Sequence, residues 1–354
     1  MRNPKTELVY SKRFSGNPKI SIAIPFYNQE RIIARNLKSV IDNLQQVAEI
    51  LLIDDSSTDY SMRALMDFIS SLDATTELKL SSISVFQNRN AQYETYCDAF
   101  LFANCNSRYV IEIQSDMQIL HKGFDLKLLR AVTSSAHLIA VSARGIEPVS
   151  GVIKGYSKTL GSDRAHSYSI VRYVISRVKY QIFSLLKPNV ATPPLVRKPE
   201  SRVLYNEVMD SEFLTTGYAG RIASKINYPV DEDYAQKDVI FIGETIMRGP
   251  IIVDKEKYMA VGGFDSERFF QGYDEHELFI KAYLLLGYRV GYTPIDFSSP
   301  LEEGSTRKRR SLSGEFQILR QLLRIMNKRK SSTLWTLLQD KTSPEYQSEI
   351  KSFS

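Results

Sequence analysis

Residues 109–120 read YVIEIQSDMQIL, a β-rich apolar run that ends in an amide, a hydroxyl and a carboxylate at Gln114, Ser115 and Asp116. One interpretation is a surface turn, because Ser and Asp are ordinary loop residues. The alternative is a site for a diphosphate and a metal ion at the carboxyl end of a buried strand. The stretch alone does not decide between them, so the rest of the chain has to.

The segments before this stretch alternate between strand-like and helix-like patterns. Apolar, β-branched runs predict strands, and apolar residues at helical spacing, after Asn28 as an N-cap, predict the first helix. The predicted strands lie at 19–24, at the start of 49–59, at 81–86 and at 109–114, and the predicted helices at 32–44, 62–69 and 91–102. This alternation indicates βαβ units and a mostly parallel sheet, whose strands are apolar because helices cover both faces.

Three of these strands end in segments that carry polar or aromatic side chains able to contact a ligand: Pro25-Phe26-Tyr27-Asn28, Asp54-Asp55-Ser56-Ser57 and Gln114-Ser115-Asp116. In open α/β sheets, ligands bind outside the carboxyl ends of the strands. A nucleobase needs a flat contact and an acceptor for its ring N–H, which Tyr27 and either Asp55 or Asp54 could supply. The competing interpretation is a proline-ended strand followed by a polar turn that caps a helix at Thr58 or Asp59.

Composition sets broad limits on the protein. Its 354 residues carry a net charge of +6 and a pI near 9.0, and much of the excess lies at 307–310, with more basic residues at 320–330. Such a cluster indicates an anionic partner, such as pyrophosphate or a lipid headgroup, or else a solvated loop. Nucleic acid is not an expected partner, because the cluster lacks interleaved aromatic residues and known motifs.

Targeting signals and disulfides are not expected. Cys97 and Cys105 would lie about 12 Å apart along one helix, which is too far for a bridge. The polar N-terminus has no apolar signal segment, and no window reaches the roughly 18 to 20 apolar residues that a membrane span needs. We therefore expect a cytoplasmic protein, with peripheral contact to an anionic membrane through 306–330 as an open alternative.

In order and spacing, five segments resemble the motifs of glycosyltransferase family 2, the GT-A fold of nucleotide-sugar-dependent transferases. They are ISIAIPFYN (20–28), ILLIDDSSTD (50–59), IEIQSDMQ (111–118), VGGFDSERFF (261–270) and GYDEHELFIKAYLLLGYRV (272–290), the last of which is predicted to be a helix. The resemblance implies a GT-A (Rossmann-like), mostly parallel central sheet flanked by helices.

The implied domain organisation has one catalytic domain and one extension. Residues 1–300 form the GT-A domain, and residues 301–354 form a basic, amphipathic helical extension. Within the domain, we expect a nucleotide-sugar-binding half, an acceptor-side insertion with a helix near 165–186, and a half that carries the catalytic base. These three parts are expected at 18–145, 146–245 and 246–300.

The resemblance also implies roles for individual residues. The matching positions for base and ribose contacts are Pro25, Tyr27, Glu30, Asp54 and Asp55. The family usually carries Asp-x-Asp where this chain has Gln114-Ser115-Asp116, so Asp116 would hold a divalent cation, Mn²⁺ or Mg²⁺, on the donor phosphates. Gln114 can still bind a ribose hydroxyl but brings no charge, so we expect weaker metal affinity and an uncertain metal dependence.

On the acceptor side, Asp274 and Glu275 match the family's acid pair with the order of the acids reversed. Glu275 would be the catalytic base, with Asp274 as the alternate or as a residue that orients the acceptor. Arg248 could bind a phosphate of the donor or acceptor, or it could have a purely structural role. Glu112, an acid inside a predicted buried strand, has no explanation from the sequence.

The expected activity is inverting transfer of a sugar from a nucleoside diphosphate-sugar to a hydroxyl of a glycan or lipid-linked saccharide, as in polysaccharide biosynthesis. A dinucleotide oxidoreductase would need the motif G-x-G-x-x-G after the first strand, and a nucleotidyltransferase would need a glycine-rich basic loop at the same place. This chain has PFYNQE there, so neither enzyme class is expected. The alternative from another class is a degenerate relative that binds nucleotide or glycan without turnover.

Overall fold

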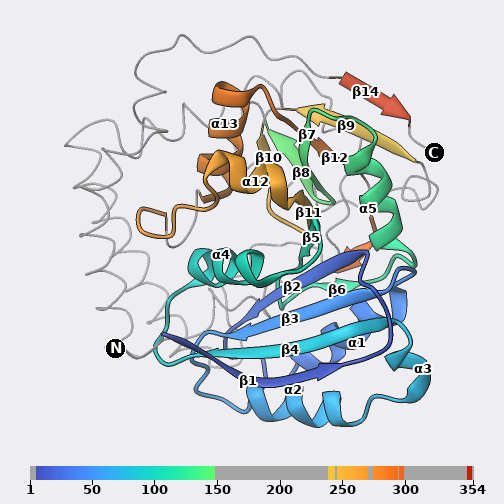
Figure 1. Ribbon diagram of the computed structural model, residues 1–354, viewed down its shortest axis with the longest axis vertical. Helices are drawn as coiled ribbons and strands as arrows, with labels where there is room; N and C mark the ends of the chain where they lie inside the picture. Colours follow the sequence, from blue (N-terminus) through green and yellow to red (C-terminus); the bar gives the residue numbers. More distant parts are fainter. Residues whose placement is uncertain are drawn as a thin grey trace, which may run out of the picture.

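A ten-stranded sheet organises the computed structural model, which describes residues 5–147, 238–243, 245–269, 274–293, 295–298 and 349–352. The strand order is β1-β4-β3-β2-β5-β11-β7-β12-β9-β14 (Figure 1). The strands are β1 (Thr6–Arg13), β2 (Ile20–Phe26), β3 (Ala48–Asp54), β4 (Leu80–Asn88), β5 (Tyr109–Glu112), β7 (Leu138–Ser142), β9 (Val239–Gly243), β11 (Ile251–Asp254), β12 (Arg289–Tyr292) and β14 (Glu349–Ser352).

Most strands of this sheet run in one direction. The neighbours β4, β3, β2 and β5 are parallel, and β11 lies antiparallel between β5 and β7. Since β12 is parallel to β7, and β9 is antiparallel to both β12 and β14, only β1, β11 and β9 run against the rest. The predicted mostly parallel α/β sheet is confirmed.

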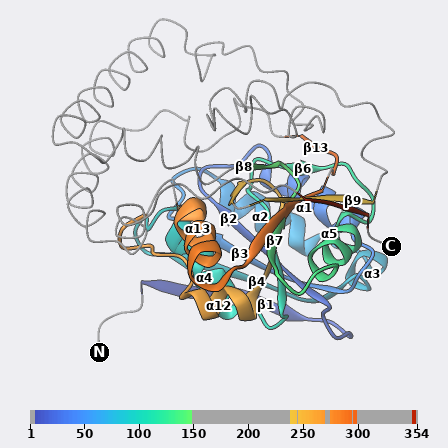
Figure 2. The same ribbon diagram turned by 90° about the horizontal axis from the view of Figure 1, so that it is seen from above.

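Helices cover both faces of the sheet, as the doubly apolar strands require. They are α1 (Ile33–Asn43), α2 (Ser61–Ser70), α3 (Ala74–Glu77), α4 (Glu94–Asn104), α5 (Phe124–Thr133), α12 (Lys255–Val261) and α13 (Asp274–Leu286). Figure 2 shows α4, α12 and α13 on one side of the sheet and α1, α2 and α5 on the other. Successive residues of β2 serve the two sides: Ile22 and Ile24 pack with α1, and Ala23 packs with α4.

The strand register brings several polar strand ends to one edge of the sheet. Phe26 lies opposite Asp54, and Asp54 lies opposite Gln87. Glu112, the last residue of β5, lies opposite Ile251, the first residue of the antiparallel β11. The loop before β11 therefore reaches the same edge as the carboxyl ends of the parallel strands.

Several local expectations need correction. Asn28 is not an N-cap: α1 begins at Ile33, because the Asn28 side chain bonds the next loop instead. The stretch 272–290 is not one helix, since α13 ends at Leu286, Gly287 takes a left-handed φ of 68°, and a strand follows. β5 ends at Glu112, two residues before the predicted end.

Two short sheets complete the described fold: β8 (Gly145–Glu147) with β10 (Thr245–Met247), and β6 (Gln118–Ile119) with β13 (Phe297–Ser298). The predicted helix near 165–186 and the basic segment 306–330 lie outside the described residues. Strand β9 falls within the range predicted as an insertion but is part of the main sheet, and β10 begins at the last residue of that range, Thr245. In the described part of the chain, no helix combines the length and apolarity needed to cross a membrane.

Candidate active site

The loops after β2 and β3 are bonded to each other at the carboxyl edge of the sheet. The amide of Asp55 donates to the carbonyl of Phe26 at 2.9 Å. The amide of Asn28 donates to Ser57 Oγ at 2.9 Å, and its side-chain oxygen accepts from the amide of Thr58 at 2.8 Å. Asn28 has a left-handed φ of 52°, a conformation that Asn tolerates better than most residues. The first two predicted motifs thus form one surface.

Pro25 is buried and Tyr27 half-buried on this surface, while Glu30 is exposed. Glu30 Oε2 accepts from the amide of Tyr60 at 3.1 Å, just before α2. A carboxylate at this position stabilises the free amides at a helix N-terminus. Tyr27 is therefore the group here that offers a ring to a planar ligand, and Glu30 supports the loop as well as facing solvent.

Asp54 and Asp55 are both buried acceptors. Asp54 Oδ1 accepts from the amide of Ser57 at 2.9 Å, and its Oδ2 accepts from Gln87 Nε2 at 2.9 Å. Asp55 accepts from Asn88 Nδ2 and from the amides of Gln92 and Tyr93, and these bonds tie down the loop that leads into α4. Burial raises the pKa of Asp55, although these hydrogen bonds oppose the increase.

The stretch after β5 forms a tight turn at the same edge. The amide of Met117 donates to the carbonyl of Gln114 at 2.9 Å, and the carbonyl of the buried Ser115 accepts from Asn36 Nδ2 at 2.7 Å. These bonds fix the turn, so Asp116 lies half-exposed at its tip. The sequence left open a turn or a ligand site, and the structure has a turn that presents a carboxylate.

Arg248 lies at the centre of a cluster of carboxylates. Its Nη1 is 3.0 Å from Asp274 Oδ2 and 3.3 Å from Glu94 Oε1. Its Nη2 contacts Asp98, and its Nε is 3.5 Å from Glu112 Oε2. The side chain is only 10% exposed. We call these five residues the Arg248 cluster. Because β11 is antiparallel, the loop before it carries Arg248 to Glu112 at the end of β5.

The Arg248 cluster holds more negative than positive groups. Asp98, Glu112 and Asp274 are fully buried, and one oxygen of each aspartate and both of Glu112 have no hydrogen-bond partner in the described structure. Burial raises the pKa of Glu112 to about 8 and that of Asp274 to about 7, against the opposing charge of Arg248. Burial raises the pKa of Asp98 well above its usual range. Protons therefore remain on part of this cluster near neutral pH.

The predicted acid pair opens α13. Asp274 points to Arg248 and is buried, whereas Glu275 is half-exposed and is the member of the pair that solvent or a substrate can reach. His276 Nδ1 lies 3.1 Å from Thr245 Oγ1, which fits the structural role that a lone histidine most often has. The next acid, Glu277, pairs with Lys281 one turn later.

Two places could be considered for a divalent cation. Oxygens of Glu94, Asp98 and Glu112 lie within 4.8 Å of one another, but the guanidinium of Arg248 pairs with all three and supplies their cation. Asp116 instead offers a half-exposed carboxylate beside the polar strand ends, and hard oxygen ligands suit Mn²⁺ or Mg²⁺. The carboxylate of Asp116 is therefore compatible with a bound cation, whereas the Arg248 cluster is not.

The structure thus brings Gln114, Arg248 and Asp274 together through Glu94, which accepts from Gln114 Nε2 at 2.7 Å. The prediction that Arg248 binds a phosphate stays a prediction, and in this structure the guanidinium faces carboxylates. Glu94 and Asp98 were missed by sequence reasoning. Their spacing of four residues after a predicted strand was the available signal.

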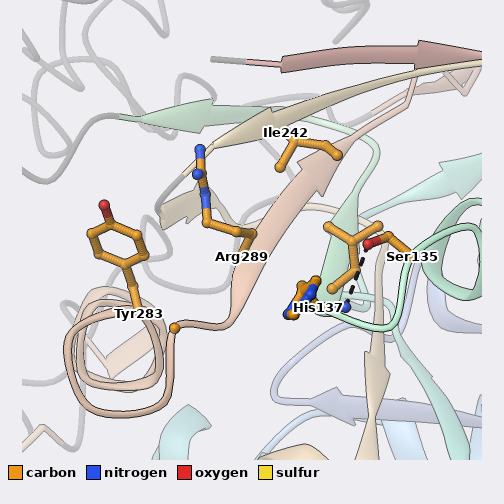
Figure 3. Close-up of a pocket in the computed structure, with 7 residues that line it drawn as sticks. Ser135, His137, Ile242, Tyr283 and Arg289 are labelled. Atoms are coloured by element: carbon orange, nitrogen blue, oxygen red, sulfur yellow. Dashed lines mark hydrogen bonds between the residues drawn. The ribbon is translucent and has the colours of Figure 1, made fainter. Parts of the chain in front are cut away.

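A separate pocket of about 290 Å³ lies at the opposite edge of the sheet, where β7 and β12 begin. Figure 3 shows Arg289 and Tyr283 on one side of it and His137 on the other. Its described lining is Ser135, His137, Leu138, Ile242, Tyr283, Gly287 and Arg289, which includes none of the predicted site residues. Arg289 Nε donates to the carbonyl of Gly243 at 2.9 Å, so this side chain also holds β9.

One protein-family model matches a segment that lies mostly in the first half of the chain. Residues 21–183 match the family model described as glycosyl transferase family 2. No curated protein matches the chain.

Several solved structures resemble the chain at low sequence identity. Mannosyltransferase PcManGT from Pyrobaculum calidifontis, in complex with GDP-Man and Mn²⁺, is 13% identical with a TM-score of 0.46, over 94% of this chain and 68% of that one. GalNAc-T7 with UDP, GalNAc and Mn²⁺ is 13% identical with a TM-score of 0.46, over 80% and 43%. S. aureus TarS is 14% identical with a TM-score of 0.41, over 87% and 43%.

Proposed function

Because residues 21–183 match the family model of glycosyl transferase family 2 and the described residues form a mostly parallel α/β sheet, we propose that the protein transfers a sugar from a nucleoside diphosphate-sugar to an acceptor hydroxyl, with inversion at the anomeric carbon. The observation that carries the proposal is the shared edge of the sheet. The ends of β2, β3 and β5 lie side by side there, and Arg248 joins Asp274, the first residue of α13, to Glu112 at the end of β5.

The nucleotide would bind over the loops after β2 and β3. Tyr27 offers its ring to the base beside Pro25, and Asp54, Asp55 and Glu30 offer acceptors for the base N–H and the ribose hydroxyls. Both aspartates are buried and already accept protein hydrogen bonds, so a ligand donor would use a remaining lone pair of a carboxylate oxygen. Gln114 and Ser115 would complete the ribose side of the site.

The diphosphate would lie next to Asp116. A cation bound there would offset the charge that develops on the leaving diphosphate. Gln114 cannot share that cation as a second carboxylate would, because it is neutral and its amide is bonded to Glu94. We therefore propose a weakly held Mn²⁺ or Mg²⁺ that binds mainly together with the donor.

Glu275 would act as the base from the start of α13, half-exposed and facing the acceptor. The acceptor O–H bond breaks as its oxygen bonds to the anomeric carbon, and the proton moves to a carboxylate oxygen of Glu275. The bond from that carbon to the diphosphate oxygen breaks, and the electron pair leaves with the diphosphate. A single displacement of this kind inverts the anomeric centre. The acceptor would be a glycan or a lipid-linked saccharide, as in polysaccharide biosynthesis.

We propose a cytoplasmic location, which fits two buried, free cysteines, Cys97 and Cys105. The predicted contact of 306–330 with an anionic membrane concerns residues outside the described structure. The division of residues 1–300 into donor, insertion and acceptor parts, with 301–354 as an extension, likewise stays a proposal.

The test begins with a panel of nucleoside diphosphate-sugars, each scored by thermal shift with and without Mn²⁺, since a bound ligand raises the apparent stability. The donor found is then incubated with glycan and lipid-linked acceptors, and both the product anomer and the released diphosphate are measured. Glu275→Gln should keep nucleotide binding and lose at least about 100-fold in turnover, in line with the usual contribution of a general base.

Glu267→Gln is the matched control, because it removes an exposed carboxylate in the segment before α13. It should transfer sugar at the normal rate. Nucleotide binding without release of diphosphate from any donor would point to the degenerate binding protein instead. Normal turnover by Glu275→Gln would rule out that residue as the base.

A further inference from the structure

The side chain of Arg248 has few solvent contacts but many protein contacts. Its Nη1 contacts both Asp274 and Glu94, at 3.0 and 3.3 Å, and its other nitrogens contact Asp98 and Glu112. Its guanidinium also lies 5.8 Å from the ring centroid of Phe264. A planar fork of donors suits this arrangement, because one guanidinium can bond several carboxylates in fixed directions. Arg248 is therefore held in place from four elements or loops around it.

The position of Asp274 beside Glu275 makes this arrangement relevant to the proposed reaction. Asp274 is fully buried and has one oxygen on Arg248, while its other oxygen has no hydrogen-bond partner in the described structure. The neighbouring Glu275 carboxylate raises the pKa of Asp274, as an acceptor for a proton on Asp274 does. If Asp274 carried the proton, it would donate to Glu275 and compete with the acceptor hydroxyl for that carboxylate.

We propose that Arg248 is a positioning residue that keeps Asp274 ionised behind Glu275, so that Glu275 is free to accept the proton of the acceptor. This inference depends on the proposed function, since it assigns a role to a contact of the proposed base. It differs from a phosphate-binding role, in which Arg248 would touch the donor directly. It also differs from a purely structural role, which would not affect the pH dependence of turnover.

The charges around Asp274 come from every side of the cluster. Asp98 of α4, Glu112 of β5, Glu275 of its own helix and Tyr258 of α12 interact with it, and Glu94 of α4 shares the guanidinium of Arg248 with it. Arg248 is the cation among them. Burial raises the pKa of Asp274, the charge of Arg248 lowers it, and the Glu275 carboxylate raises it further. Removal of that charge should therefore leave Asp274 protonated to higher pH.

The experiment compares pH–rate profiles of kcat/KM for the wild type, Arg248→Met and Arg248→Lys, using the donor and acceptor found for the wild type. Arg248→Met should move the acid limb of the profile to higher pH by at least one unit. The loss of kcat/KM relative to the wild type should therefore be at least 10-fold larger at pH 6.5 than at pH 9. Arg248→Lys keeps a charge and should restore part of this shift. The Kd for the nucleoside diphosphate should stay within twofold in both variants.

Arg108→Met is the matched control for loss of an ion pair. Arg108 Nη2 pairs with the buried Asp254 at 2.9 Å, at the far end of the same strand β11. This variant should lose stability without a shift of the acid limb. Circular dichroism and urea unfolding report whether each variant folds. If Arg248→Met does not fold, the pH–rate profile of Arg248→Lys tests the proposal, and its acid limb should shift to higher pH by a smaller amount.

The outcomes separate this inference from the proposed function. If the wild type transfers sugar and neither Arg248 variant shifts the acid limb, the positioning role is wrong and the proposed function stands. If the acid limb is unchanged and the nucleotide Kd rises at least 10-fold, Arg248 is a phosphate ligand and the positioning role is again wrong. If the wild type transfers no sugar from any donor, the proposed function itself fails.

Discussion

Gln114 donates its side-chain amide to Glu94, with Nε2 2.7 Å from Oε1. The same Glu94 oxygen lies 3.3 Å from Arg248 Nη1. Glu94 therefore needs a donor at position 114, and a second carboxylate there would add to a cluster that already holds four acids and one guanidinium. This contact gives a physical reason for the glutamine where family 2 enzymes usually carry the first acid of Asp-x-Asp.

Gln114→Glu tests that reason, because it replaces the donating NH₂ by an oxygen of the same size. We expect the free energy of unfolding at pH 8 to fall by about 1 to 3 kcal/mol, since a charge-assisted hydrogen bond is lost and two carboxylates face each other. The double variant Gln114→Glu/Glu94→Gln restores a donor and an acceptor with their places exchanged. It should recover at least half of the loss in urea unfolding.

Gln118→Glu adds the same charge in β6 and serves as the control for that series. It should change the stability by less than about 0.5 kcal/mol, as surface substitutions usually do. A Gln114→Glu protein as stable as the wild type, or a double variant worse than the sum of the two single ones, would contradict the account of Gln114 given above.

Much of the fold follows from local patterns in the sequence. The apolar stretch of β3 ends abruptly in Asp54-Asp55, and Ile33, Leu37, Val40 and Ile41 repeat at helical spacing and are all buried in α1. These features depend on near neighbours, so periodicity and strand-end polarity predicted them. The segment 289–292 was missed as a strand, because its residues continue the apolar pattern of α13 without a Pro to mark the break at Gly287.

The site was less predictable because its decisive contacts are non-local. The acid inside β5, Glu112, had no sequence explanation, and its partner Arg248 comes from a loop far along the chain. Only the antiparallel insertion of β11 beside β5 brings the two together. The expected contact of Asp55 with a ligand stays a prediction, and its bonds to Gln92 and Tyr93 depend on a loop conformation that no short pattern encodes.

Asp55→Ala should loosen the loop that leads into α4. The substitution leaves the amides of Gln92 and Tyr93 without their acceptor, and Tyr93 holds a left-handed φ of 69° that needs support from its surroundings. We expect the free energy of unfolding to fall by about 2 to 4 kcal/mol. Asp55→Asn retains one oxygen acceptor and should cost less than half as much.

Hydrogen exchange locates this effect. In Asp55→Ala the amides of Gln92 and Tyr93 should exchange at least 10-fold faster than in the wild type, and nucleotide affinity should fall with them. Asp42→Ala removes an exposed aspartate that pairs with Lys38 on α1, and it should leave both exchange rates unchanged. Unchanged protection in Asp55→Ala would show that the loop is held by other contacts.

Glu112→Gln should make the protein more stable at alkaline pH. Burial raises the pKa of Glu112 from 4.5 to about 8 in the folded state. Between these values the folded protein binds more protons than the unfolded chain, so its stability falls as the pH rises. Below about pH 4.5 Glu112 is protonated in both the folded and the unfolded state. Above about pH 8 it is ionised in both, so the full cost of burying its charge lowers the stability in that range. The glutamine mimics the protonated acid and never ionises.

The free energies of unfolding of the wild type and of Glu112→Gln should therefore differ by less than about 1 kcal/mol at pH 5. At pH 8.5 the variant should be more stable than the wild type by about 2 to 4 kcal/mol. Urea unfolding at half-unit steps from pH 5 to 8.5 measures the difference without any substrate. Glu267→Gln, an exposed glutamate, should show no such trend. A Glu112→Gln protein that loses stability as the pH rises, relative to wild type, would mean that Glu112 is ionised in the fold and that its charge is needed by Arg248.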